Sequence, residues 1–324
     1  MLIRPRRNRA SDAIRALVRE TVLRPSDLIL PVFVQEGEGR RTPIGAMPGC
    51  ERLSPDLLLA HARQVHAAGI RGIALFPALS EVYKDARASA SVDDAGLLQG
   101  TVRMLKQALP DLLVITDVAM DPYSSDGHDG VVCDGEIRND ETLPILAAMA
   151  VSQARAGADM VAPSDMMDGR VAAIRQALDA AGFTGVGICS YCVKYASAFY
   201  GPFREALDSA PRHGDKRSYQ MDPANRREAR REVALDEAEG ADWLMIKPAL
   251  AYLDVIKEVR EHSSLPVAAY HVSGEYAMLR AAAANGWLDY DACLLEALTA
   301  CKRAGADIIF TYGALDAARL LRDR

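Results

Sequence analysis

The chain contains short, nearly continuous apolar segments that recur between longer amphipathic stretches. Eight such segments cover residues 28–34, 72–77, 112–118, 158–163, 185–190, 241–247, 266–271 and 306–311. In the stretches between them, such as SPDLLLAHARQVHAAG and DGRVAAIRQALDAAG, apolar residues return every three or four positions, which is the helical period. Several of these stretches end on glycine, which is a typical helix end. The pattern therefore predicts strands that alternate with helices.

Short apolar strands that alternate with helices are typical of a parallel sheet buried on both faces. Eight strand–helix units predict an α/β fold, a (β/α)8 TIM barrel, which we expect to occupy residues 26–324. A doubly wound open sheet is the alternative, but PVFVQEGEGRR is a poor match for the glycine-rich phosphate turn of that fold. Residues 1–25 are basic, and we expect either a frayed tail or an arm that packs on a neighbouring subunit.

The composition excludes some classes of protein. A net charge of −6 argues against a general nucleic-acid binder. No window approaches ~18 uninterrupted apolar residues, so we expect neither a transmembrane helix nor a membrane partner. The first residues lack the apolar core of a secretory signal, which favours a cytoplasmic protein. The six cysteines include the pair Cys189 and Cys192 but no zinc-finger spacing, and we expect most of them to be reduced thiols.

Polar and ionisable residues collect where the predicted strands end. In a (β/α)8 barrel these positions share one face, where the βα loops build the active site. From the third strand to the eighth, they are Asp117; Ser164, Asp165 and Asp168; Lys194, Tyr195 and Arg204; Lys247; Ser273; and Thr311 with Tyr312. The loop after the third strand adds Asp121 and Asp129. A single site explains this grouping better than separate structural roles.

Lys247 ends the apolar segment WLMIK, where a charged side chain is costly. Burial of an unpaired cation costs several kcal/mol, so the amine tends to lose its proton instead. A second lysine nearby, Lys194, would disfavour the charge further. A neutral amine can attack a ketone and form a Schiff base. Taken singly, Lys247 could equally cap the barrel through an ion pair, and Lys194 could be a surface lysine on a helix.

Cationic residues follow the fifth strand, in GPFR (201–204) and RHGDKR (212–217). Their setting suggests a mobile lid, and cations on a lid suit a carboxylate substrate. The residues alone therefore indicate amine-mediated chemistry on a keto acid. The structural alternatives are turn formation by Asp121 and Asp129, a barrel-top aromatic role for Tyr312, and a solvated basic face made of Arg204, Lys216 and Arg217.

Five motifs resemble those of a known family. They are APSDMMDGR (162–170), SYCVKYASAFYGPFR (190–204), SYQMDPANRREA (218–229), GADWLMIKPALAYLD (240–254) and YHVSGEYAM (270–278). They are similar to motifs of the 5-aminolevulinate dehydratases, or porphobilinogen synthases, and the resemblance covers nearly the whole chain. It implies a lyase that condenses two molecules of 5-aminolevulinate to porphobilinogen, with loss of two waters, in tetrapyrrole (heme) biosynthesis. It also implies a homo-octamer in which the N-terminal arm embraces a partner subunit.

The resemblance also implies roles for individual residues. Lys247 would form the main Schiff base and Lys194 the second. The residues expected to bind substrate are Ser273 and Tyr312 for one carboxylate, Arg204 and Lys216 for the other, Gln220 on the lid, and Ser164 and Asp117 beside the lysines. At positions 216 and 217 this chain has lysine and then arginine, whereas many relatives have arginine and then lysine. Either Lys216 or Arg217 could therefore be the carboxylate ligand.

The metal site is where this sequence departs from zinc-dependent relatives. Ala119, Asp121 and Asp129 stand where those relatives carry three cysteines, and zinc prefers thiolate and imidazole ligands. We therefore expect no catalytic zinc and a magnesium-type bacterial form. Asp121 and Asp129 would either bind a hard cation or steer the substrate amine. Glu232 matches the position that holds an activating, allosteric Mg²⁺ in many bacterial relatives, although alone it reads as an ion-pair partner on a helix.

Two other functions compete with this interpretation. A class I aldolase-type barrel also uses a Schiff-base lysine, but it needs only one such lysine and commonly a phosphate site. A catalytically inactive paralogue would have lost a lysine, Ser273 or Tyr312, and all of these residues are present.

Overall fold

Eight parallel strands form a closed barrel in the computed structural model, which describes residues 1–207 and 211–322. β1 pairs with β12 and closes the sheet, with Leu28 opposite Ile309. The strands are β1 (Leu28–Gln35), β4 (Gly72–Ala78), β5 (Leu113–Val118), β8 (Met160–Pro163), β9 (Gly187–Lys194), β10 (Trp243–Lys247), β11 (Val267–His271) and β12 (Ile308–Thr311). The predicted TIM barrel is confirmed, and each of the eight predicted segments overlaps one of its strands.

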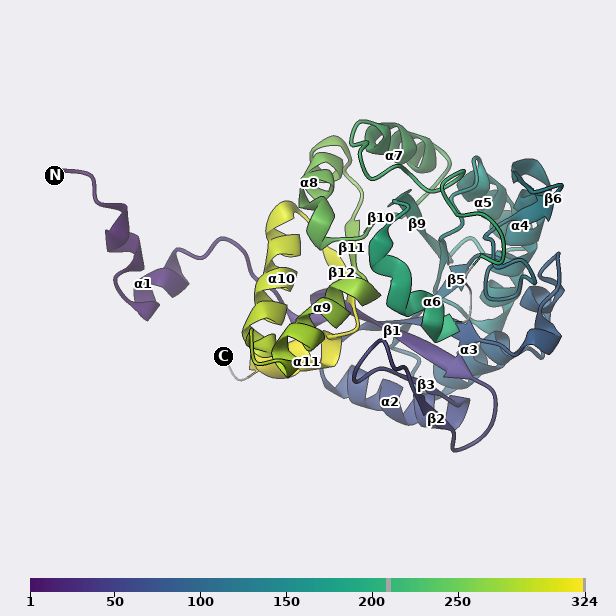
Figure 1. The fold of residues 1–324 in the computed structure, drawn as a ribbon, viewed down its shortest axis with the longest axis horizontal. Coiled ribbons are helices and arrows are strands. Elements are labelled where there is room, and N and C mark those ends of the chain that lie inside the picture. The colour runs from purple at the N-terminus through teal and green to yellow at the C-terminus, as the bar shows by residue number, and fades with distance from the viewer. Residues whose placement is uncertain (208–210, 323–324) are drawn as a thin grey trace.

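Helices surround the barrel (Figure 1). Those that alternate with the strands are α2 (Pro55–Ala67), α3 (Leu97–Ala108), α4 (Asn139–Ala156), α5 (Arg170–Ala180), α7 (Glu228–Ala238), α8 (Leu253–His262), α10 (Tyr290–Ala304) and α11 (Ala314–Arg322). Two further helices, α6 (Gly201–Leu207) and α9 (Ser273–Ala284), pack on each other beside the barrel opening. The predicted glycine stops are real helix ends, since α4 ends at Gly157 with a φ of 105°.

The barrel has two apolar layers because each strand buries both of its faces. In β1, Ile29 and Phe33 point to the barrel interior, where they join inward side chains such as Phe76, Met245 and Phe310. The alternate residues of β1 pack against the surrounding helices; they are Leu28, Leu30, Val32 and Val34. This double burial is the reason that the strand segments read as nearly continuous apolar runs.

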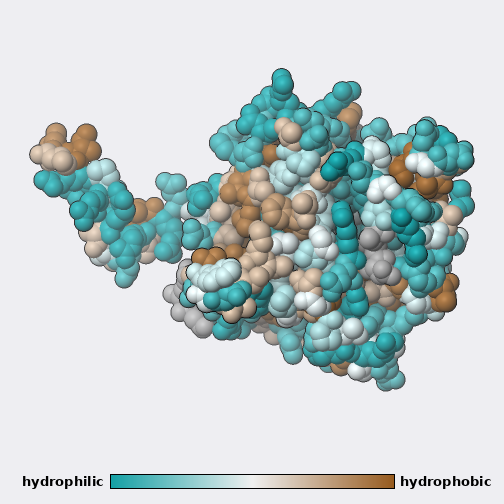
Figure 2. Space-filling model, viewed as in Figure 1, coloured by the Kyte–Doolittle hydropathy of each residue, from teal (hydrophilic) through white to brown (hydrophobic). Residues whose placement is uncertain are grey.

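Residues before the barrel project away from it (Figure 1). They form η1 (Pro5–Arg9) and α1 (Asp12–Leu17), neither of which buries a residue. The tip of the segment is apolar (Figure 2), and Leu2 is 89% exposed. Among the described residues, no helix combines the length and the apolar character needed to cross a membrane.

Several short elements were not predicted. They are the antiparallel strands β2 (Arg41–Pro43) and β3 (Glu51–Leu53), the hairpin β6 (Val131–Cys133) and β7 (Glu136–Arg138), and the 3-10 turns η2 (Pro25–Asp27), η3 (Glu81–Tyr83), η4 (Ser89–Val92), η5 (Ala198–Tyr200) and η6 (Leu250–Tyr252). One predicted boundary was wrong, because β9 runs on to Lys194 and does not end near Ser190.

Candidate active site

Lys194 and Lys247 end two neighbouring strands, β9 and β10, and are register partners in the sheet. Each is only 6% exposed. The Lys194 ammonium donates a hydrogen bond to the Ser164 backbone carbonyl and lies 3.9 Å from Asp129 Oδ2. The structure thus places Lys194 inside the barrel mouth, at a strand end, and rules out a surface lysine on a helix.

Aromatic rings surround the Lys247 amine. Its Nζ lies 4.7 Å from the ring centroid of Tyr270, 5.0 Å from Phe203, and 5.2 Å from both Tyr191 and Tyr200. Within the described part of the chain, this amine has no ion pair and no hydrogen bond, so it is not the salt-bridged cap considered above. Burial, and then the charge of Lys194, lowers the pKa of Lys247 to about 7.

Three acidic residues stand beside the lysines, and Lys216 bridges two of them. Lys216 Nζ lies 3.2 Å from Asp121 Oδ2 and 3.1 Å from Asp129 Oδ2. Although burial acts to raise the pKa of Asp129, the ammonium groups of Lys194 and Lys216 hold it below its ordinary value. Burial, with Asp121 adding to it, raises the pKa of Asp117 to about 7.

The side chains of Lys216 and its neighbour Arg217 lie in different environments. Lys216 is 9% exposed and points into the acidic group, whereas the Arg217 side chain is 81% exposed and pairs with Asp215 at 3.6 Å. Only Lys216 is therefore positioned inside the barrel mouth.

The loop after β5 does not form a metal centre of side-chain ligands. Among the described residues, no group of three or more His, Cys, Asp or Glu side chains could hold a metal ion. The Lys216 ammonium already lies between Asp121 and Asp129, and Ala119 offers no donor atom. His128, which lies nearby, instead contacts the hydroxyl of Tyr219 at 3.1 Å.

Ser273 and Tyr312 follow the ends of β11 and β12, close to the aromatic rings that surround the Lys247 amine. The Tyr312 hydroxyl lies 3.1 Å from that of Tyr270, whose ring contacts the Lys247 amine. Ser273 is 1% exposed at the start of α9, and its Oγ accepts a hydrogen bond of 3.1 Å from the Phe203 backbone N–H. The helix start adds a positive electrostatic potential, so this corner suits a carboxylate.

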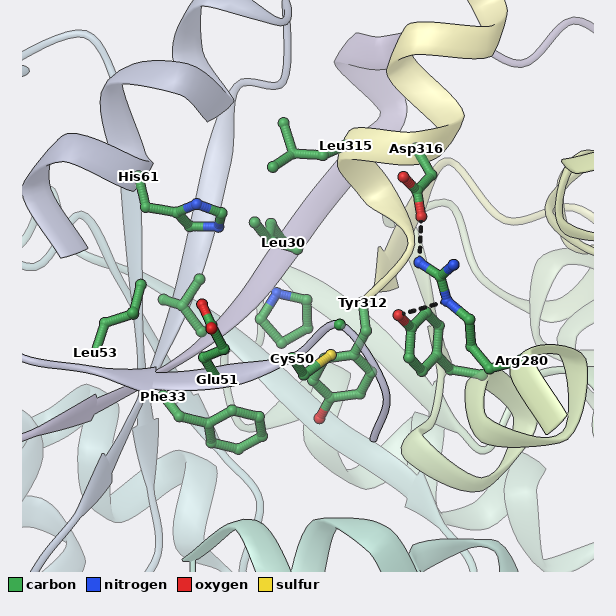
Figure 3. A pocket seen from close by; sticks show the side chains of 14 residues that line it. Leu30, Phe33, Cys50, Glu51, Leu53, His61, Arg280, Tyr312, Leu315 and Asp316 are labelled. Atoms are coloured by element: carbon green, nitrogen blue, oxygen red, sulfur yellow. Dashed lines mark hydrogen bonds and ion pairs between the residues drawn. The ribbon is translucent and has the colours of Figure 1, made fainter. Parts of the chain in front are cut away.

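A cavity of about 170 Å³ lies next to Tyr312 (Figure 3). His61 and Arg280 line it from α2 and α9, and Arg280 donates hydrogen bonds to Asp316 at 2.6 Å and to Tyr276 at 2.9 Å. Neither Lys194 nor Lys247 is among the lining residues. The two amines instead lie in the closely packed barrel mouth.

The other predicted substrate-binding residues include buried and exposed side chains. Ser164 is 5% exposed at the end of β8, beside Asp117. Gln220 is also 5% exposed, and the backbone N–H of its neighbour Met221 donates a hydrogen bond of 3.0 Å to the Lys194 carbonyl. Arg204 lies exposed on α6. Part of the predicted lid, residues 208–210, lies outside the described residues.

Glu232 belongs to a separate cleft of mixed charge, which Arg227 and Arg231 also line. It lines a space of about 710 Å³ on α7, together with Asp168, Arg170, Asp236 and other charged residues. Burial and the nearby Asp236 raise the pKa of Glu232 to about 7. Such a raised value marks a place where a cation would relieve repulsion between carboxylates.

Sequence reasoning missed the aromatic residues around Lys247. Tyr191, Tyr200 and Phe203 belong to the motif SYCVKYASAFYGPFR, and Tyr270 opens YHVSGEYAM. The available signal was that these aromatic residues belong to the motif that contains Lys194 and to the motif that follows the Lys247 strand.

A TIM barrel with paired, buried lysines at the ends of adjacent strands is equipped for Schiff-base chemistry on a carbonyl substrate. The family model described as delta-aminolevulinic acid dehydratase matches residues 2–320, and the chain belongs to this family. It is 56% identical over 323 residues to the chloroplastic enzyme of Physcomitrium patens, covering 99% of this chain and 74% of the relative. It is 57% identical over 320 residues to that of Oryza sativa subsp. japonica, covering 98% and 75%.

A solved structure agrees with these matches. The delta-aminolevulinic acid dehydratase of Toxoplasma gondii, in complex with porphobilinogen, superposes with a TM-score of 0.98 at 52% identity, covering 100% of this chain and 93% of the other. The protein is therefore a lyase that condenses two molecules of 5-aminolevulinate to porphobilinogen in tetrapyrrole biosynthesis. The family is metal-dependent.

The relatives overturn one prediction. The similar enzymes from Physcomitrium patens, Oryza sativa, Arabidopsis thaliana and Chlamydomonas reinhardtii are named as chloroplastic, which contradicts the prediction of a cytoplasmic location. This chain covers 74% to 84% of the length of these relatives.

Proposed function

We propose that Lys247 and Lys194 carry the condensation as two Schiff bases. The observation that supports this most is the Lys247 amine, which is buried among aromatic rings with its pKa lowered to about 7. Its lone pair attacks the ketone carbon of 5-aminolevulinate, a carbinolamine forms, and the ketone oxygen leaves as water. Lys194 does the same with the second substrate molecule, so the two ketone oxygens account for the two waters lost.

Nearby groups move the protons that this chemistry needs. Asp117 has a pKa raised to about 7, so it can exchange a proton near neutral pH. Ser164 lies beside it, and its backbone carbonyl orients the Lys194 amine. Asp121 and Asp129 face Lys194 and Lys216 and suit the substrate amino group by charge.

The two substrate carboxylates bind to two different sets of residues. Ser273 and Tyr312 hold one of them, supported by the helix start at Ser273. Lys216, Gln220 and Arg204 hold the other. The exposed position of Arg204 means that α6 has to move for this contact, and Lys216 then exchanges its aspartate partners for the substrate carboxylate.

We also propose a zinc-free, magnesium-type enzyme. The donor set at Ala119, Asp121 and Asp129 lacks thiolates, which argues against zinc there. Glu232 would hold an Mg²⁺ ion that keeps most of its waters, since Mg²⁺ commonly binds through one or two carboxylates. Bound there, the ion would place positive charge beside Glu232 and act allosterically.

Residues 1–25 are proposed to form an arm that binds a second copy of the chain in a homo-octamer, ahead of a catalytic barrel at 26–324. The support is the exposed apolar tip of the arm and the absence of buried residues in η1 and α1. An apolar segment exposed to this extent is typical of an interaction surface.

Replacement of the lysines tests the catalytic proposal. Both Lys247→Met and Lys194→Met should lower kcat by about a thousandfold or more, because each removes a covalent step. Lys257→Met is the matched control, since Lys257 is an exposed partner of Glu261 on α8. If Lys247→Met retains more than about a tenth of wild-type kcat, this lysine is not the main Schiff base.

A further inference from the structure

The loop that follows Lys247 is held by a carboxylate from another part of the barrel. Glu275 Oε1 accepts a hydrogen bond from the Leu250 backbone N–H at 2.6 Å, and Oε2 contacts the Ala249 N–H at 3.4 Å. Both donors lie within three residues of Lys247. Since Glu275 is 1% exposed, these bonds are shielded from water.

The same carboxylate fixes the start of α9. Glu275 Oε2 accepts a hydrogen bond of 2.8 Å from the Val272 backbone N–H, one residue before Ser273. A carboxylate in the first turn of a helix is favoured by the unpaired N–H groups and by the helix dipole. One side chain therefore ties the loop beyond the main amine to the helix start that carries Ser273.

The start of α9 is also fixed against η5, the turn before α6. A Cβ on Gly274 would lie 2.4 Å from the Phe199 carbonyl oxygen, so no side chain fits there. Ser273 Oγ in turn accepts a hydrogen bond from the Phe203 N–H at 3.1 Å. Three segments thus meet at this point: the loop after β10, the start of α9 and the base of α6.

We propose that Glu275 is a positioning residue, which sets the Lys247 amine relative to the Ser273 carboxylate-binding corner. This inference rests on the roles proposed above for Lys247 and Ser273. Reaction of an amine with a ketone requires near-attack geometry, and a displacement of about 1 Å can cost about 100-fold in rate. Glu275 itself does not touch the substrate; it acts through the backbone on both sides of the bound molecule.

Replacement of Glu275 by glutamine separates positioning from packing. Glutamine has nearly the same volume as glutamate. Its NH₂ group, however, is a hydrogen-bond donor and cannot accept hydrogen bonds from the backbone N–H groups that Glu275 binds. We expect kcat/KM to fall about 10- to 100-fold, with KM for 5-aminolevulinate raised as well as kcat lowered. The adduct trapped on Lys247 by reduction should fall at least fivefold relative to the adduct on Lys194. Glu275→Asp keeps a carboxyl group that can accept these hydrogen bonds and should restore part of the loss.

Glu258→Gln is the matched control. Glu258 is 7% exposed and pairs with Arg230 on the outer helices, so its replacement also removes a nearly buried carboxylate. It should leave kcat, KM and the ratio of the two adducts within twofold of wild type. Thermal unfolding of both variants shows whether they lose comparable stability.

Three results would overturn the proposal. In folded Glu275→Gln, kinetics and an adduct ratio within twofold of wild type would do so, as would losses that Glu258→Gln reproduces. If Glu275→Gln does not fold, amide hydrogen exchange in the wild type decides: the N–H groups of Ala249, Leu250 and Val272 should exchange together and slowly, and rapid, independent exchange contradicts the proposal. A wild type that forms no Lys247 adduct at all would instead refute the catalytic role of Lys247.

Discussion

Lys194 and Lys247 stand side by side as register partners at the ends of β9 and β10, but among the described residues only the Lys194 side-chain amine has polar partners. Lys194 faces Asp129 and the Ser164 carbonyl, whereas Lys247 faces aromatic rings. The sheet thus presents two amines to one space in different electrostatic surroundings. This difference agrees with the lowered pKa of the Lys247 amine.

The pH dependence of adduct formation tests this difference. Because the pKa of Lys247 is lowered to about 7, its free amine increases as the pH rises through 7 and then reaches a plateau. The initial rate of Lys247 reduction by cyanoborohydride with 5-aminolevulinate should be about tenfold lower at pH 6 than at the plateau. Lys194→Met removes a neighbouring positive charge and should move the profile to higher pH. A rate that still climbs beyond pH 9 would indicate an ordinary lysine.

Lys247→Met should stabilise the fold while it abolishes activity. A lysine whose pKa falls from 10.5 to about 7 on folding destabilises the native state fully below pH 7, and this cost vanishes as the pH rises through 10.5. The variant should gain about 1 kcal/mol or more of unfolding free energy at pH 7, and less at pH 10. Urea unfolding at both pH values measures the gain. A loss of stability at pH 7 would contradict the unpaired, buried amine.

Ser273→Ala and Tyr312→Phe would each remove one of the hydrogen bonds proposed to hold a substrate carboxylate. Bonds to charged groups are worth about 1.5–3 kcal/mol, so KM should rise about 10- to 100-fold. Ser263→Ala is the control for the serine change, since the Ser263 hydroxyl only accepts a hydrogen bond from the Leu265 N–H on the outer side. Steady-state kinetics measures the effect, and an unchanged KM in both variants would place the carboxylate elsewhere.

Lys216→Met and Arg217→Met distinguish the two candidate lid cations. Lys216→Met leaves Asp121 and Asp129 buried without their shared partner, which should cost about 3–5 kcal/mol of unfolding free energy and raise KM at least about tenfold. Arg217→Met changes an exposed residue and should alter stability by less than about 0.5 kcal/mol. The reverse order of effects would identify Arg217 as the ligand.

The metal proposal predicts a specific response to chelation. A zinc-selective chelator should leave the activity unchanged, since Ala119, Asp121 and Asp129 provide no thiolate. EDTA should lower the activity, and Mg²⁺ should restore it. In Glu232→Gln the activity should no longer respond to Mg²⁺, because the cleft loses the carboxylate proposed to bind the ion. Restoration of the wild type by Zn²⁺ alone would refute the zinc-free assignment.

The barrel was predictable because local pattern and tertiary burial agree. Each strand is buried on both faces, so its apolar run is visible in the sequence, and the position of Lys247 at a strand end follows from WLMIK alone. The segment SYCVK was less clear. Its residue Ser190 is buried in β9 and accepts a hydrogen bond of 3.1 Å from Arg170, a partner that no local pattern reveals.

The side-chain contacts of the two buried lysines Lys247 and Lys216 could not be predicted from the sequence. Of the rings around Lys247, those of Tyr191, Tyr200 and Phe203 precede it in the chain and that of Tyr270 follows it. The fold of the closed barrel brings these rings together. The short strands β2 and β3 contain too few residues to show a period. The partners of Lys216 likewise lie 87 and 95 residues away.

The most direct test of the central claim is a map of trapped adducts. The wild type is incubated with 5-aminolevulinate, reduced with borohydride and digested, and the modified lysines are identified by mass spectrometry. The account predicts an adduct on Lys247 and a second on Lys194, with exposed lysines such as Lys257 unmodified. Active, folded enzyme that carries no adduct on Lys247 would contradict it.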